Sequence, residues 1–244
     1  MWLCLLTVDV SNERRCLSSS SFFVFFLRLL SSLSLLLCFL FIQGGSSFEL
    51  AASGFNDVVG FDYSQSFVDA ANDMKNNKDL TFRVPLEAET YTEVSAMHQH
   101  NVNEEVRNRC TFQTGDACNL VNDFNNGTLG TDQFDAAILA NLLCRLPDPI
   151  ACLDGLEKCI AKDGIAVIVT PFSWLEQFTH KSKWLGGYDD PVSGTPIDSY
   201  DRLRAEMETR GFEQVHHEQM PLVIREHRRK YQYIVSEATG WRKK

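Results

Sequence analysis

The sequence predicts an α/β fold in which a mostly parallel sheet carries helices on both faces. Beyond residue 43, short apolar runs typical of buried strands alternate with segments of helical period. Acidic residues accompany three of these runs, Val58–Asp62, Thr111–Ala117 and Phe134–Asn141. A carboxylate at the C-terminal end of a strand lies on the rim where open α/β sheets bind ligands, and it accepts hydrogen bonds from ribose or adenine. The order of the three stretches therefore predicts a nucleotide-type cofactor.

The first part of this region predicts two helices around one buried strand, followed by an insertion. The strand ends at Asp62, and Ser64 or Ser66 would cap the helix after it. The insertion is polar and contains Pro85, which is typical of a loop or a hairpin with a short helix. The expected ranges are 47–53 and 64–75 for the helices, 57–61 for the strand and 76–105 for the insertion.

The second part predicts strands and helices in regular alternation. Apolar side chains recur on one face of the helix 148–161, and Ile165–Thr170 is apolar almost throughout, as a strand buried on both faces would be. Lys162–Gly164 is the expected turn between these two elements, and Gly211 is expected to end the helix 198–209. The remaining expected strands are 110–113, 136–140, 212–220 and 230–237.

The composition argues against nucleic-acid binding and against a metal site. The chain has 244 residues and a net charge of -9, whereas nucleic-acid binders usually present a basic face. A local basic patch at Arg225 and His227–Lys230 is interpreted as a solvated charge run. The histidines lack carboxylate or cysteine partners at ligand spacing, so we expect no bound metal.

The cysteines indicate a reducing compartment. They form no CxxC pair and no zinc-finger spacing, and several lie inside apolar patterns. They are therefore expected to be small buried hydrophobic residues, and the protein is expected to be cytoplasmic. The eight positions are 4, 16, 38, 110, 118, 144, 152 and 159.

Residues 1–43 differ in composition from the rest of the chain. They carry two acidic and three basic residues, and Phe22–Ile42 is almost wholly apolar residues and serine. A run of this length is long enough to span a bilayer, and Arg14–Arg15 precede it as positive flanks would. One interpretation is a signal anchor through residues 22–42, which would make the protein membrane-anchored. The other is a mistranslated front end, because low-complexity nucleotide sequence yields such serine, leucine and phenylalanine monotony.

Two classes of α/β enzyme use an acid at the end of the second strand, and the residues favour one of them. Dinucleotide dehydrogenases need a Gly-x-Gly-x-x-Gly turn, but only Gly44 and Gly45 are present here. Methyltransferases that use S-adenosylmethionine also have an acid after the third strand and an aromatic-Asp pair opening the fourth. Gly115–Ala117 and Phe134–Asp135 fit that pattern. Each of these motifs taken alone is better explained as a helix cap or a turn. Their order along the chain is what favours the methyltransferases.

Four longer strings make the resemblance specific. Together they resemble the methyltransferase of ovothiol biosynthesis, a 4-mercaptohistidine (5-thiohistidine) N-methyltransferase often found as the C-terminal domain of a larger synthase. The similarity covers residues 44–244, and Thr170–Gly187 resembles the stretch of that family after its fifth strand. The strings are VVGFDYSQSFVDAA (58–71), VRNRCTFQTGDACNL (106–120), ANLLCRLPDPIACL (140–153) and PLVIREHRRKYQYIVSEATGW (221–241).

This resemblance implies a fold, a reaction and a cofactor site. The fold is the Rossmann-like class I methyltransferase sheet, whose last strand is antiparallel. The reaction is methyl transfer from S-adenosylmethionine to an imidazole nitrogen of a thiolated histidine, a small amino-acid substrate. In-line transfer of this kind needs little acid–base machinery, so no catalytic residue is assigned. The implied cofactor contacts are Asp62 to the ribose, Asp116 and Ala117 to the adenine, Asn141 to the methionine end, and Gly44 and Gly45 in the loop.

The substrate implied by the resemblance suggests further candidate residues. An amino-acid carboxylate calls for an arginine, and Arg145 and Arg225 are the candidates. Trp174, Trp184 and Tyr231 would stack on the imidazole, or else they pack a lid onto the sheet.

The resemblance stops at Gln43, and this departure divides the chain. The family loop begins with an acid and a glycine, where this chain has Cys38 and Leu40, and only Gly44–Leu50 retains the family sequence. We therefore predict an atypical front end over 1–43 and a methyltransferase domain over 44–244 that lacks an intact first strand and glycine loop. A faulty gene model is favoured over an anchor. The alternatives are a cofactor-deficient methyltransferase-like protein and a membrane-anchored protein with a Rossmann-like domain.

Overall fold

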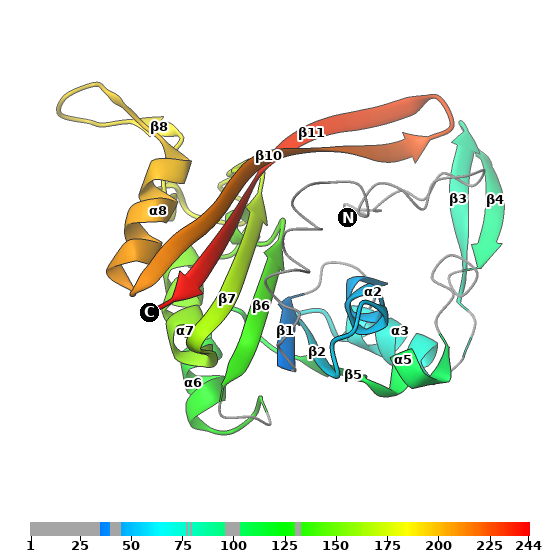
Figure 1. Cartoon of the computed structure of the whole chain (residues 1–244). Coiled ribbons are helices and arrows are strands. Elements are labelled where there is room, and N and C mark those ends of the chain that lie inside the picture. The colour runs from blue at the N-terminus through cyan, green and yellow to red at the C-terminus, as the bar shows by residue number, and fades with distance from the viewer. Residues whose placement is uncertain (1–34, 40–44, 77, 79, 96–102, 130–132) are drawn as a thin grey trace.

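The computed structural model describes residues 35–39, 45–76, 78, 80–95, 103–129 and 133–244, and its centre is a seven-stranded sheet. The order across the sheet is β10-β11-β7-β6-β1-β2-β5 (Figure 1). The strands are β1 (Leu35–Phe39), β2 (Asp57–Asp62), β5 (Cys110–Thr114), β6 (Phe134–Ala140), β7 (Ile160–Thr170), β10 (Phe212–His227) and β11 (Lys230–Lys243).

The pairing directions confirm the predicted fold class. The pairs β5–β2, β2–β1, β1–β6 and β6–β7 are all parallel. Strand β11 is antiparallel to both β7 and β10. Because β11 is inserted between β7 and β10, the last strand of the chain is not at the edge of the sheet. This is the mostly parallel sheet with an antiparallel last strand that the sequence predicts.

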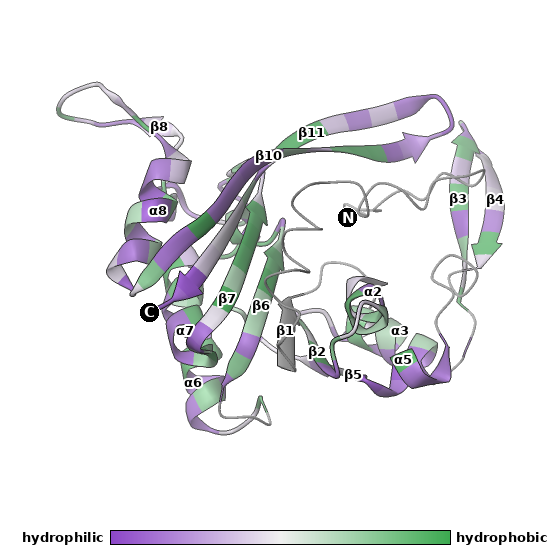
Figure 2. Cartoon of the chain, in the orientation of Figure 1, coloured by the Kyte–Doolittle hydropathy of each residue, from purple (hydrophilic) through white to green (hydrophobic). Residues whose placement is uncertain are grey.

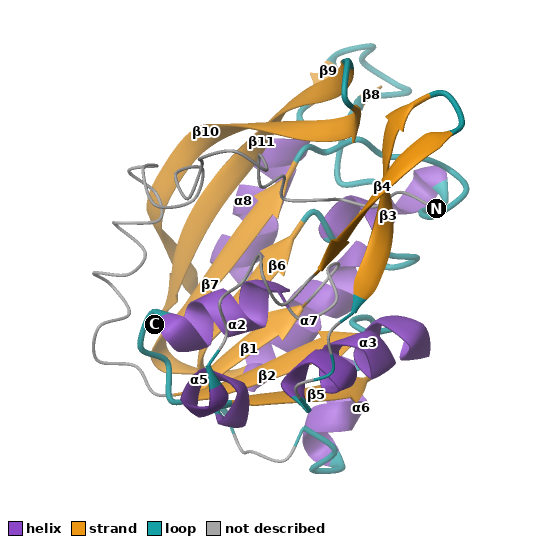
Figure 3. Cartoon of the chain, turned by 90° about the vertical axis from the view of Figure 1, so that its right-hand side faces the viewer, coloured by secondary structure: helices purple, strands orange, loops and turns teal. Residues whose placement is uncertain are grey.

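Helices cover both faces of the sheet (Figure 3). Helices α2, α3 and α5 lie on one face, and α6, α7 and α8 lie on the other. Each face has its own apolar cluster, so the sheet is buried on both sides over β6 and β7, which are largely hydrophobic (Figure 2). The helices are α2 (Gly45–Ala52), α3 (Gln65–Lys75), α5 (Glu104–Asn108), α6 (Leu120–Asn125), α7 (Pro149–Cys159) and α8 (Ser199–Thr209).

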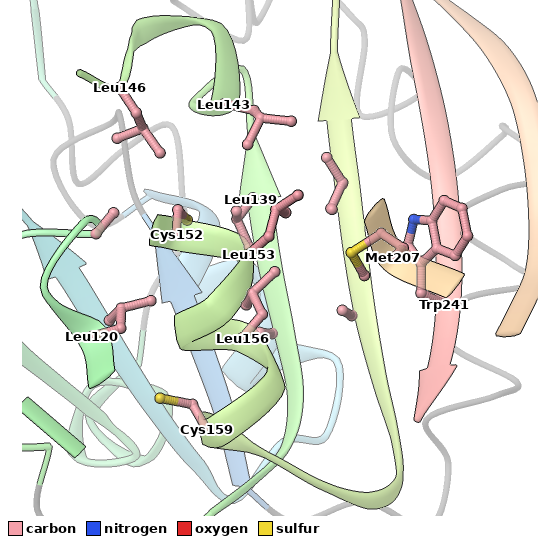
Figure 4. Close-up of a cluster of buried hydrophobic side chains, with 14 of the residues drawn as sticks. Leu120, Leu139, Leu143, Leu146, Cys152, Leu153, Leu156, Cys159, Met207 and Trp241 are labelled. Carbon is pink, nitrogen blue, oxygen red and sulfur yellow. The ribbon is translucent and has the colours of Figure 1, made fainter. Parts of the chain in front are cut away.

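The larger cluster lies between the sheet and α7. Leu153 and Leu156 of α7 pack toward Leu139 of β6, and Trp241 of β11 closes the cluster beside Met207 of α8 (Figure 4). All five side chains are fully buried. The helices begin where the sequence provides caps, because the side chain of Asp148 accepts from the backbone of Ala151 and that of Asp198 from Tyr200 and Asp201.

One interior strand of the sheet comes from the segment that the sequence analysis assigns to the front end. Strand β1 lies between β6 and β2 and pairs in parallel with both, with Cys38 opposite Ile138 and Gly60. Residues 22–34 and 40–42 of the candidate anchor lie outside the described residues. Among the described residues, no helix has the length and apolar character needed to cross a membrane. The division of the chain at residue 43 stays a prediction, although the sheet includes residues before it.

The predicted turn at Lys162–Gly164 lies inside a strand. Helix α7 ends at Cys159 and β7 begins at once with Ile160, but the pairing with β6 jumps from Ile160 to Ile165. The intervening residues bulge out, and Asp163 has a φ of 65°. Glycine is required at 164, since an added Cβ would lie 2.8 Å from two backbone oxygens. The sequence thus located the chain reversal but not the strand that continues through it.

The insertion between α3 and β5 contains a β-hairpin and a short helix, as predicted. Its strands are β3 (Thr81–Glu87) and β4 (Thr90–Ser95), and its helix is α5. Two further short strands, β8 (Tyr188–Asp189) and β9 (Pro196–Ile197), pair with each other between β7 and α8. Two 3-10 turns, η1 (Leu143–Arg145) and η2 (Lys181–Lys183), complete the elements.

Strands β10 and β11 are much longer than the sequence predicts. The last pair between β11 and β7 joins Glu237 to Thr170, and beyond it the two strands continue as a free ribbon. We call residues 220–236 the arm. It extends from the sheet to the β3–β4 hairpin (Figure 1), where the backbone N–H of Arg228 donates to the carbonyl of Leu86. Arg228 and Arg229 also form ion pairs with Glu87, so part of the basic patch joins the two hairpins.

The described cysteines behave as the sequence predicts. Cys110, Cys144, Cys152 and Cys159 are buried, Cys118 is partly buried, and all five are free thiols. Burial raises the pKa of Cys110 and Cys159 to about 12, so neither is a thiolate at neutral pH.

Candidate active site

Three candidate cofactor residues lie at the same edge of the sheet. Asp62 is the last residue of β2, Asp116 follows β5 by two residues, and Asn141 follows β6 directly. Because β2, β5 and β6 run parallel, their C-terminal ends share one rim. A backbone hydrogen bond of 2.9 Å from Gly115 to the carbonyl of Asp62 ties the first two strand ends together. The structure thus brings together residues that are far apart in the sequence.

Asp62 carries a half-buried carboxylate. The backbone N–H of Ser64 donates to its Oδ1 at 2.7 Å, which holds the side chain at the start of α3. Burial raises the pKa of Asp62 above its usual value, and the Ser64 hydrogen bond offsets part of that rise. A desolvated carboxylate with acceptor capacity left over is suited to binding a pair of hydroxyl groups.

Gly115 lets β2 and β5 approach closely at the rim. An added Cβ at this position would lie 1.7 Å from Cζ of Phe61, whose ring is fully buried. Its φ is not in the left-handed region, so space alone requires glycine here. The ring of Phe61 therefore occupies the space that a side chain at position 115 would need.

Asp116 and Ala117 lie in the turn after β5. Oδ1 of Asp116 accepts from the backbone N–H of Cys118 at 2.8 Å, which closes the turn before α6. Ala117 is buried in the larger apolar cluster. The hydrogen bond to Cys118 and the burial of Ala117 therefore hold the backbone of this turn in place, as a binding loop requires.

Two of the four described non-glycine residues with a positive φ lie at the ends of β6 and β7. Asn141 has a φ of 55° and Phe172, two residues after β7, has a φ of 48°. Two non-glycine residues in this conformation at adjacent strand ends are typical of a functional site. The backbone N–H of Asn141 donates to the carbonyl of Val169 at 2.7 Å, and Oγ of Ser236 lies 3.4 Å from its Oδ1. Strand β11 therefore reaches the rim through Ser236.

The first turn of α2 contains a buried hydroxyl. Oγ of Ser47 has no hydrogen-bond partner among the described residues, and the residue is fully buried. An orphaned donor at a helix N-terminus is suited to a carboxylate or another anionic group. Gly45 is buried beside it, whereas Gly44 lies outside the described residues.

Three of the candidate substrate residues form one cluster on the α7 face. The guanidinium of Arg145 donates to the carbonyls of Cys144 and Ser173, and it lies over the ring of Phe178. Trp174 and Trp184 stack with ring centroids 6.4 Å apart. The indole of Trp174 donates to Ser199 at 3.0 Å, and that of Trp184 donates to Thr179 at 2.7 Å. These contacts favour the packing of the loop after β7 as the role of the tryptophans.

The other two candidates, Arg225 and Tyr231, lie on the arm. They are cross-strand partners, and Nε of Arg225 is buried without a hydrogen-bond partner among the described residues. Side chains alternate along each strand, so the arm has two faces. The inner face includes Ser236, which contacts Asn141; its other members are Met220, Leu222, Ile224, Gln232 and Ile234. The outer face consists of Pro221, Val223, Arg225, Tyr231, Tyr233 and Val235. Arg225 and Tyr231 therefore point away from the face that meets the rim.

Two residues of this site escaped the sequence analysis. Ser236 reaches the rim only because β11 is inserted antiparallel beside β7, and a serine within a strand gives no local signal. Ser47 lies in the retained loop sequence Gly44–Leu50, so its position beside the glycines was the available signal.

Solved structures share this fold at low sequence identity. Magnesium protoporphyrin IX methyltransferase from Synechocystis, with bound SAM, has a TM-score of 0.52 and 14% identity, covering 91% of this chain and 76% of that chain. A protein from work on converting a disulfide bond into a thioacetal group in echinomycin biosynthesis gives 0.52 and 16%, over 85% and 74%. The [4+2]-cyclase SpnF gives 0.52 and 13%, over 88% and 79%. At such identity the likeness shows the fold alone.

The sequence itself matches one protein family. None of the curated proteins compared with the chain matches it. The family described as "Methyltransferase domain" matches residues 44–217, which is well over half of the chain. With the strand order of the sheet and the shared rim of Asp62, Asp116 and Asn141, this match assigns the protein: it belongs to the methyltransferase domain family.

Proposed function

We propose that the protein transfers a methyl group from S-adenosylmethionine to an imidazole nitrogen of a thiolated histidine. The observation that supports this cofactor is the shared rim, where Asp62, Asp116 and Asn141 lie at the C-terminal ends of three parallel strands. The substrate rests on the resemblance of residues 44–244 to the ovothiol methyltransferases.

The residues of the rim fit the cofactor. Asp62 offers a desolvated carboxylate to the ribose hydroxyls, and the turn at Asp116 and Ala117 would hold the adenine. Ser47 offers an unused buried hydroxyl to the methionine carboxylate at the N-terminus of α2. When bound, S-adenosylmethionine supplies an electrophilic methyl group on a sulfonium.

The protein's own contribution is positioning. A neutral imidazole nitrogen is already a nucleophile, so the chain needs to hold it about 3 Å from the methyl carbon and exclude water. The inner face of the arm is apolar apart from Gln232 and Ser236, and it is suited to covering the rim above Asn141. Arg145 stays the candidate for the substrate carboxylate, and its present contacts to two backbone carbonyls would have to be shared with it.

Calorimetry on the full chain tests the cofactor, and mass spectrometry tests the reaction. We expect S-adenosylmethionine and S-adenosylhomocysteine to bind, and we expect a thiolated histidine to gain one methyl group. Histidine without the sulfur is the matched control substrate. If the cofactor binds but neither compound is methylated, the proposed substrate is wrong. If S-adenosylmethionine does not bind, the proposed cofactor is wrong.

The second candidate function is that of a methyltransferase-like protein that does not bind the cofactor. It is favoured by Cys38 and Leu40, which replace the acid and the first glycine of the family loop. Cys38 is one residue before the end of β1, and its register partner in β2 is Gly60, two residues before Asp62. Leu40 lies outside the described residues.

Restoring the loop should separate these two functions. We expect Cys38→Glu combined with Leu40→Gly to strengthen S-adenosylmethionine binding about tenfold or more, because the two substitutions restore the acid and the glycine of the family loop and the acid adds a charge-assisted hydrogen bond. Calorimetry on the full chain measures the change, with each single substitution as a control. Unchanged affinity in a folded double variant would contradict a role for this loop in binding.

The affinity for S-adenosylmethionine should also depend on pH through Asp62. The ionised carboxylate accepts the ribose hydrogen bonds, and protonation removes this capacity. Since burial raises the pKa of Asp62 above its usual 3.8, we expect binding to weaken as the pH falls, beginning at a higher pH than for an exposed aspartate. Calorimetry over a pH series checks this, and Asp62→Asn should remove the dependence. The same dependence in that variant would assign it to another group.

A further inference from the structure

The outer face of the arm is an exposed apolar strip at the edge of the sheet. Val223 is 46% exposed, Tyr231 54%, Tyr233 69% and Val235 43%. They are side by side, because Val223 pairs with Tyr233, Pro221 with Val235 and Arg225 with Tyr231. Val192, the most exposed of the described large apolar residues, lies in the β8–β9 loop and not in this strip. A contiguous strip of this kind marks an interaction surface.

We propose that this outer face is the interface of a homodimer in which two copies pack their arms face to face about a two-fold axis. A fully exposed aromatic side chain presents about 150–250 Å², so the four exposed residues present on the order of 400 Å² of apolar surface. A standard interface buries roughly 800 Å² per partner, somewhat over half of it apolar. The strip is thus of the size that one half of a stable symmetric contact needs.

The order of residues along the strip favours a second copy over another partner. Arg225 and Tyr231 lie toward the tip of the arm, and Gln219 and Glu237 lie on the same face at its base, with the apolar pairs between them. A two-fold axis across the middle reverses one arm against the other. It therefore sets Arg225 and Tyr231 of one copy against Gln219 and Glu237 of the other, and it does so twice.

This arrangement brings an arginine and a carboxylate from different copies together across the axis. Arg225 forms no ion pair among the described residues, and its Nε is buried without a partner. Glu237 is held by His217 at 2.6 Å and by Gln219 at 3.3 Å, so its carboxylate is fixed on this face. Both the order of the residues along the strip and their charges are therefore self-complementary, as an isologous interface requires.

Charge reversal with mixing tests the proposal on the full chain. We expect the wild type to sediment as a dimer at micromolar concentration, and Arg225→Glu and Glu237→Arg each to weaken dimerisation about tenfold or more, because each sets like charges against each other twice. An equimolar mixture of the two variants should dimerise again, since both contacts become attractive in the mixed pair. Misfolding of a variant cannot produce this recovery.

Two further variants complete the experiment. Tyr233→Lys should dissociate the dimer, whereas Val192→Lys, at an exposed valine outside the strip, should leave it intact. Circular dichroism confirms that each variant is folded. A monomeric wild type would overturn the proposal, as would a dimer that persists in Arg225→Glu and Tyr233→Lys. A mixture of folded charge variants that stays monomeric would overturn the antiparallel arrangement.

Discussion

Replacing Asp62 with alanine should weaken S-adenosylmethionine binding by roughly 30- to 1000-fold. The carboxylate is half-buried and would accept two hydrogen bonds from the ribose, each charge-assisted. Removing them should cost about 2–4 kcal/mol of binding free energy, at about 1.4 kcal/mol per factor of ten. Calorimetry on the full chain measures the dissociation constants of both proteins.

The effect of Asp62 on folding should have the opposite sign to its effect on binding. Its raised pKa means that the folded protein holds the ionised form at a cost, so Asp62→Asn should be at least as stable as the wild type at neutral pH. Denaturant unfolding checks this. Asp57→Asn, at the exposed start of the same strand, is the matched control and should leave cofactor affinity unchanged. Equal losses of affinity in the two variants would contradict the assignment of Asp62 to the ribose.

Gly115→Ala should lower the free energy of unfolding by about 3 kcal/mol, at the upper end of the usual cost of overpacking. The new Cβ would lie 1.7 Å from Phe61 Cζ and 2.2 Å from its Cε2, and the ring is fully buried. The turn between β5 and α6 would have to shift, so cofactor affinity should fall as well. Urea unfolding and calorimetry measure the two effects.

A compensating substitution separates crowding from backbone effects at Gly115. Phe61→Leu removes the ring atoms that the Cβ would meet, so we expect Gly115→Ala to cost less in that background than in the wild type. The four free energies of unfolding form a double-mutant cycle. We expect the double variant to be more stable than the sum of the two single losses implies. Strictly additive losses would show that Phe61 is not the reason for glycine at this position.

The fold was predictable wherever burial dictates the sequence pattern. The expected helices 148–161 and 198–209 match α7 and α8 to within two residues, and the apolar run Ile165–Thr170 located the second half of β7. The length of the arm was not predictable, because its strands continue beyond the main core, where burial no longer dictates the sequence pattern. Strand β1 was missed because its leucines belong to a longer apolar run with no period of its own.

The site was predictable where it follows strand ends and not where it depends on the order of strands. Asp62, Asp116 and Asn141 were placed on one rim by the parallel alternation of elements alone. Ser236 depends on β11 entering beside β7, which no local pattern indicates. The orientation of Arg225 and Tyr231 depends on the register of β10 against β11, and a shift of one residue would exchange the two faces of the arm.

The position of β1 gives residues of the front end a role in the continuity of the sheet. Without Leu35–Phe39, β6 and β2 would face each other across a missing strand, and the sheet would divide into halves held together only by helices and loops. A shortened protein that begins at residue 44 should therefore lose cooperative unfolding. A bilayer-spanning segment over Phe22–Ile42 would include the same five residues, Leu35–Phe39. The segment can therefore form either the interior strand β1 or part of a membrane anchor, and a single molecule adopts one of these two structures at a time.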